Sequence, residues 1–142
     1  MVVQNREESV DVGHALAALH VRLTAEQVRC YALAARMPGG RFMSDEAARK
    51  EGLPGQIVPG NMSIALFARV IAAAWPTAEL LQLHATFRGL VRPEVPLVVH
   101  GVVTETHRDA HGDRIECDLV LEGAEGDRWV TGTASIRLPA RN

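Results

Sequence analysis

The chain has 142 residues, 47% of them hydrophobic, and its 15 basic and 17 acidic side chains leave a formal charge of −2. This length and this apolar content suffice for one sizeable core and are typical of one domain. The nearly balanced charge creates no overall field that would attract nucleic acid or an anionic membrane, so neither is expected as a partner.

The N-terminal residues 1–12 read as a polar leader, and residues 13–142 are expected to form one domain. The leader is too polar to be the apolar core of a signal peptide. The most apolar run, 62–75, is interrupted by Ser63 and Arg69, so no membrane-spanning helix is expected. These features predict a cytoplasmic protein.

The two cysteines, Cys30 and Cys117, lie far apart in the sequence. They lack the clustered spacing of a zinc site or of a disulfide framework. We expect both to be packing residues, because free cysteine commonly behaves as a small buried hydrophobic side chain. No metal site is predicted.

Two helices are expected in the first third of the chain. A Thr-x-x-Gln capping box at 24–27 predicts a helix over 25–36. The Pro-Gly-Gly sequence at 38–40 predicts a loop after it. A short helix from Ser44, as N-cap, to Gly52 follows, since its first turn is acidic and its last turn basic.

A third helix is predicted over 61–74, with Asn61 as its N-cap and Pro76 closing it. Apolar side chains surround much of its circumference, which indicates a helix buried on most sides.

Strand patterns occupy the second half of the chain, at 79–88, 95–106, 113–122 and 128–138, and a short strand is possible within 13–23. Four consecutive strands predict an antiparallel meander. Helices followed by strands indicate an α+β fold, with the third helix packed on one face of the sheet.

Three segments carry motifs in a defined order: YALAARMPGGRFMS at 31–44, leading to Gly-Leu at 52–53; QIVPG at 56–60; and FRGLVRPEVPL at 87–97. They resemble, respectively, the helix and Asn-Pro-x-His turn, the Pro-Ile-x-His-Gly start of the central helix, and the Phe-x-x-Pro-Val-x-Pro-Gly-Asp segment of the MaoC-like family of acyl-thioester hydratases and dehydratases. The resemblance covers about 23–138. It implies the hot-dog fold, an antiparallel β-sheet wrapped around a central α-helix.

The catalytic residues of that family are replaced here. The family uses an aspartate and a histidine of its first loop as base and acid, and the gap-free alignment places Met37 and Phe42 at these positions. Shifting the register by one residue places Pro38 and Met43 there instead. None of these side chains can transfer a proton.

The binding half of the family's site is retained in the sequence. Gly60, preceded by Pro59, starts the central helix, where exposed amides can polarise a thioester carbonyl. Met37 and Phe42 would make the pocket more apolar, and Arg41 would either meet a phosphate of coenzyme A or lie exposed in its loop.

Other polar residues are assigned plainer roles. His84 is expected to face solvent or an interface, and His100 to be a hydrogen-bonded core or interface histidine. Arg88 and Arg92 would reach a phosphopantetheine channel or serve as surface charges. His107 and His111 are expected to be solvated near a turn.

The resemblance implies a protein that binds acyl thioesters of coenzyme A or of acyl carrier protein and needs no cofactor. It would be a catalytically degenerate hydratase or dehydratase of fatty acid or polyketide metabolism, or the non-catalytic subunit of a pair. Because the family commonly assembles its hot-dog protomers in pairs, the resemblance implies a homodimer, or a heterodimer with a catalytic MaoC-like chain.

Two alternatives remain open at this point. One is an active lyase or thioesterase that uses other carboxylates, such as Asp45 or Glu51. The other is a non-enzymatic small-ligand-binding or scaffolding module of a biosynthetic pathway.

Overall fold

The computed structural model describes residues 10–140, so most of the expected leader at 1–12 lies outside the described residues. Within that range Val10 packs against the hydrophobic core. Gly13 and Leu16 then donate backbone hydrogen bonds to Val103 and Gly101, which ties this segment to the sheet.

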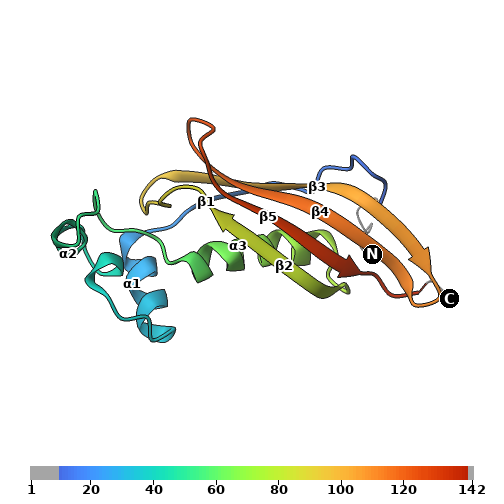
Figure 1. Ribbon diagram of the computed structural model, residues 1–142, viewed down its shortest axis with the longest axis horizontal. Coiled ribbons are helices and arrows are strands. Elements are labelled where there is room, and N and C mark those ends of the chain that lie inside the picture. The colour runs from blue at the N-terminus through green and yellow to red at the C-terminus, as the bar shows by residue number, and fades with distance from the viewer. Residues whose placement is uncertain (1–9, 141–142) are drawn as a thin grey trace, which may run out of the picture.

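Five antiparallel strands form one sheet in the order β1-β3-β4-β5-β2 (Figure 1). The strands are β1 (Leu19–Arg22), β2 (Glu79–Phe87), β3 (Pro96–Asp109), β4 (Gly112–Gly123) and β5 (Arg128–Arg137). The predicted meander is correct for β3, β4 and β5 and wrong for β2, which pairs with β5 from Glu79↔Arg137 to Phe87↔Val130. Local alternation identifies strands, whereas their neighbours are set by long-range packing. The segment between β2 and β3 therefore crosses from one edge of the sheet to β3, which lies next to the other edge strand, β1.

Four helical segments precede or interrupt the sheet: α1 (Ala25–Ala34), the 3-10 turn η1 (Gly40–Phe42), α2 (Asp45–Lys50) and α3 (Gly60–Ala74). The predicted capping box is present, because Thr24 Oγ1 accepts from the Gln27 amide at 3.0 Å and Gln27 Oε1 accepts from the Thr24 amide at 2.9 Å. Ser44 caps α2 as predicted. Across residues 10–140, no helix has the length and apolar character needed to cross a membrane.

The long helix α3 lies against one face of the sheet (Figure 1). Its buried residues are Ser63, Leu66, Phe67, Val70, Ile71 and Ala74. The expectation of burial on most sides is wrong, since Ala65, Ala72 and Ala73 are exposed. Small alanine side chains made the outer face look apolar in the sequence although nothing in the described chain covers it.

Helix α3 also contacts the sheet at Gly132 of β5. A Cβ atom on this glycine would lie 2.9 Å from Cε2 of Phe67, whose side chain is fully buried. The missing side chain therefore leaves room for the ring of Phe67 against β5.

Candidate functional site

The N-terminus of α3 is the first component of the site. Pro59 is its N-cap and makes no side-chain capping hydrogen bond. The first amides of a helix have no partners within the helix, and the helix dipole adds partial positive charge there. These amides therefore provide a place for a carbonyl oxygen. The predicted N-cap, Asn61, is an exposed residue of the first turn, because the helix begins at Gly60.

A hollow of about 170 Å³ lies beside this helix terminus. The ring of Phe87, at the end of β2, covers Gly60 so closely that a Cβ atom there would lie 2.9 Å from its Cζ. Among the lining residues, Ser63 is the one with a polar side chain. The residues that line the hollow are Ile57, Val58, Gly60, Ser63, Phe87, Gly89, Leu90 and Val91.

The loop between α1 and α2, which contains Met37 and Phe42, lies next to the segment leading into α3. The Arg41 carbonyl accepts from the Ile57 amide at 3.0 Å, and the Phe42 carbonyl accepts from Gln56 Nε2 at 2.9 Å. Met37 and Phe42 are half-buried, and neither lines the hollow. The backbone of this loop therefore lies beside the segment that leads into α3. The roles of Met37, Phe42 and Arg41 toward a ligand stay predictions.

The charged residues around this loop are engaged in holding it together. Asp45 Oδ1 accepts from the Gln56 amide at 2.8 Å, and Arg92 Nε donates to the Gln56 carbonyl at 3.0 Å. Arg41 Nε lies 3.1 Å from Glu51 Oε2. Asp45 and Glu51 therefore help to hold the loop in place, which argues against a catalytic role for either carboxylate.

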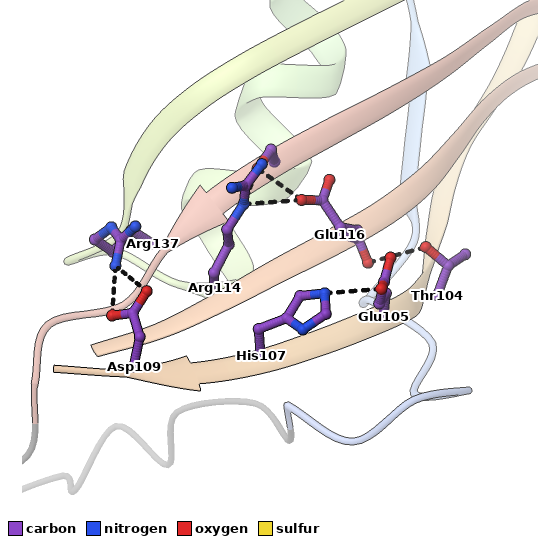
Figure 2. A network of polar contacts seen from close by, with 8 residues as sticks. Thr104, Glu105, His107, Asp109, Arg114, Glu116 and Arg137 are labelled. Atoms are coloured by element: carbon purple, nitrogen blue, oxygen red, sulfur yellow. Dashed lines mark hydrogen bonds and ion pairs between the residues drawn. The ribbon is translucent and has the colours of Figure 1, made fainter. Parts of the chain in front are cut away.

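A second polar network covers the outer face of the sheet (Figure 2). Ser135 Oγ donates to Glu116 Oε1 at 2.9 Å, and Arg114 Nε donates to the same oxygen at 3.1 Å. Glu116 on β4 pairs with Ser135 on β5. Ser135 lies five positions along β5 from Val130, the residue that pairs with Phe87 of β2 at the hollow. At about 3.3 Å per residue this is roughly 16 Å, so the network is separate from the hollow.

The same figure shows the turn between β3 and β4. A hydrogen bond from the His111 amide lowers the pKa of Asp109, and Arg137 adds to the effect through a contact of 3.0 Å. His107 Nε2 lies 2.7 Å from Glu105 Oε1 on β3. The contact between Asp109 and Arg137 joins the ends of β3 and β5, which indicates a structural role for these residues.

Most histidine predictions agree with the structure. His84, His107 and His111 are exposed, and His100 is half-buried with Nε2 3.1 Å from Glu122 Oε1. Arg88 is exposed and donates to Thr131 Oγ1 at 3.3 Å.

The cysteine prediction is correct for Cys117 and wrong for Cys30. Cys117 is buried in the core, and burial raises the pKa of its thiol to about 12. Cys30 is exposed on α1 because it lies on the helix face opposite Val28 and Ala32, which are buried. Among residues 10–140 no group of three or more His, Cys, Asp and Glu side chains is placed to hold a metal ion.

The arrangement of the sheet around α3 matches that of solved enzymes. The (R)-hydratase from A. caviae involved in PHA biosynthesis matches with a TM-score of 0.83 at 22% identity, covering 92% of this chain and 98% of that one. The chain has the hot-dog fold. A chain of the ChsH1-ChsH2 complex from Mycobacterium tuberculosis gives 0.81 at 20% identity (92% and 99% covered), and a MaoC-like dehydratase from Rhodospirillum rubrum gives 0.82 at 17% (93% and 94%).

The predicted α+β class and hot-dog fold are thereby confirmed. The sequence matches no protein-family model and no curated protein. At these identities the likeness establishes the hot-dog fold, and the chemistry has to be argued from the site itself.

Sequence reasoning missed Ser63, which had been noted only as an interruption of an apolar run. Its side chain is fully buried, and its Oγ has no hydrogen-bond partner among the described residues. A serine three residues after the first residue of an apolar helix was the available signal, but its burial depends on how the helix packs in the fold and cannot be read from neighbouring residues.

Proposed function

We propose that this hot-dog protein binds acyl thioesters of coenzyme A or of acyl carrier protein and lacks the proton-transfer pair of hydratases. The observation that carries the proposal is the hollow at the N-terminus of α3. There, uncapped amides meet an apolar wall at the segment that matches the family's carbonyl-binding helix start. The loop beside it carries Met37 and Phe42, which can neither activate water nor protonate carbon.

The test measures binding and turnover separately. Titration calorimetry with hexanoyl-CoA should show saturable binding, and an assay of crotonyl-CoA hydration by the isolated chain should stay at background. Appreciable hydration would contradict the lack of catalysis. Failure to bind hexanoyl-CoA or the hexanoyl thioester of acyl carrier protein, both by the chain alone and with its hot-dog partner, would contradict the whole proposal and favour a scaffolding module.

We further propose that a second hot-dog chain completes the site. The hollow, at about 170 Å³, is smaller than the roughly 300 Å³ at which small-molecule sites begin. Strand β2 lies at the edge of the sheet, and Leu80, Leu81 and Phe87 on it are exposed at 42%, 41% and 50%. Pairing of this edge with the same edge of a second chain would bury the exposed apolar side chains of both chains.

The partner would be a second copy or a MaoC-like chain that carries the aspartate and histidine. One relative in structure, ChsH1-ChsH2, is a complex of two chains. Light scattering should report a dimer for the isolated chain or for its mixture with such a partner, and Leu81→Lys should dissociate it. In the mixed case hydration should appear only in the complex. A chain that stays monomeric with every MaoC-like partner from its own genome would contradict this part of the proposal.

A further inference from the structure

The hydroxyl of Ser63 is a buried polar group whose state the fold does not explain. Its side chain has no exposed surface, and its Oγ has no hydrogen-bond partner among residues 10–140. Leaving a buried hydroxyl unpaired costs stability, and native proteins retain few such groups. Alanine at this position would fit an interior turn of α3 at least as well.

Ser63 and Gly60 face the same hollow. Residues three apart lie on one face of a helix with their Cβ positions about 5–6 Å apart. Both residues line the hollow, and the Gly60 position points at the ring of Phe87. Ser63 and Gly60 therefore border one small space from neighbouring positions of α3.

The chemistry of this space selects a neutral acceptor. A hydroxyl can donate or accept, the amides of Gly60 and Asn61 can only donate, and the other lining side chains are apolar or absent, so an acceptor can use all of these groups. No basic side chain belongs to the described wall, so a fully charged phosphate or carboxylate would be balanced by the helix dipole alone. A polarised carbonyl oxygen needs only the donors.

We propose that the Ser63 hydroxyl donates a hydrogen bond to the carbonyl oxygen of the bound acyl thioester, alongside the amides of the first turn of α3. The inference rests on the proposed thioester binding and assigns a binding residue to that site. Ser63 then discriminates a thioester from an otherwise identical ligand without the carbonyl.

The experiment compares two ligands that differ by that oxygen. Hexanoyl-CoA carries the thioester carbonyl, and S-hexyl-CoA is the thioether without it. By calorimetry, Ser63→Ala should weaken hexanoyl-CoA binding about 3- to 10-fold, the worth of one hydrogen bond, and leave S-hexyl-CoA binding unchanged. Ser135→Ala is the matched control, because that serine is also buried but donates to Glu116 on the outer face of the sheet. It should change neither affinity.

Thermal unfolding of the ligand-free variants provides a second readout. Ser63→Ala should raise Tm, because it removes a buried group without a partner, whereas Ser135→Ala should lower it by breaking a hydrogen bond. A lower Tm for Ser63→Ala would overturn the proposal by showing that the hydroxyl has an internal partner.

The remaining outcomes separate the inference from the proposed function. If the wild-type chain binds hexanoyl-CoA and Ser63→Ala weakens both ligands equally or neither, the role of Ser63 is wrong and thioester binding stands. If the wild-type chain binds neither ligand, both proposals fail together.

Discussion

Replacing Gly60 by alanine places a methyl group at the start of α3, 2.9 Å from Cζ and 3.2 Å from Cε1 of Phe87. The ring is 50% exposed and can turn away, so we expect the crowding to cost about 1–2 kcal/mol. Alanine is favoured over glycine in a helix by up to about 1 kcal/mol, which offsets much of this. The net change in unfolding free energy should stay near 1 kcal/mol, or about 3–5 °C in Tm.

Ligand binding should respond more strongly than stability. The methyl group and the displaced ring occupy the approach to the first amides of α3, so the carbonyl loses a hydrogen bond and part of the helix dipole. Together these are worth about 1–2 kcal/mol, or roughly 5- to 30-fold in Kd for hexanoyl-CoA by calorimetry. Asn61→Ala, an exposed change in the same turn, is the control and should bind like the wild-type chain.

A double-mutant cycle tests the role of the ring. Phe87→Leu shortens the side chain that the new methyl group would strike, so Gly60→Ala should be less harmful in the Phe87→Leu background. Unchanged hexanoyl-CoA binding by Gly60→Ala would refute the assignment of this helix terminus as the carbonyl site. Additive effects of the two substitutions would refute the steric explanation.

Three further predictions concern the loop, the core and the turn between β3 and β4. Met37→Asp with Phe42→His should raise crotonyl-CoA hydration at least about 100-fold above background, and no gain in a variant that still binds hexanoyl-CoA would show that more than the pair is missing. Because burial raises the pKa of the Cys117 thiol to about 12, iodoacetamide at pH 8 should label only the exposed Cys30 in the folded chain and both thiols in denaturant. The lowered pKa of Asp109 adds stability that is present above its ordinary pKa near 3.8 and is lost as the pH falls through the folded value. Asp109→Asn should therefore flatten the fall of Tm between about pH 4 and pH 2.5, and parallel curves would contradict this.

The parts of the fold that sequence patterns predicted are those governed by neighbouring residues. Thr24 and Ser44 cap their helices as expected, because a cap depends on the next three residues. The alternation of Ile115 and Cys117 with polar residues placed β4 correctly, since it follows directly from the two-residue period of a strand.

The parts that sequence patterns missed depend on contacts between distant segments. β2 pairs with β5 and not with β3, although its own alternation is the same in either place. The 3-10 turn at Gly40–Phe42 replaces a predicted loop, because the Arg41 and Phe42 carbonyls are held by the segment before α3. The burial of Ser63 beside Phe87 at the hollow likewise brings together α3 and β2, which are separate segments of the chain.

The loop between α1 and α2 is held in place by its backbone and not by the side chains of Met37 and Phe42. Its anchors are backbone groups: the Met37 amide donates to the Ala32 carbonyl at 2.9 Å, and the Phe42 carbonyl accepts from Gln56 Nε2 at 2.9 Å. Substituting Met37 or Phe42 leaves these hydrogen bonds in place, because none of them uses either side chain. Different side chains at these two positions therefore need not change the path from the loop into α3. By the same argument, Met37→Asp with Phe42→His should leave the backbone of the proposed binding site in place.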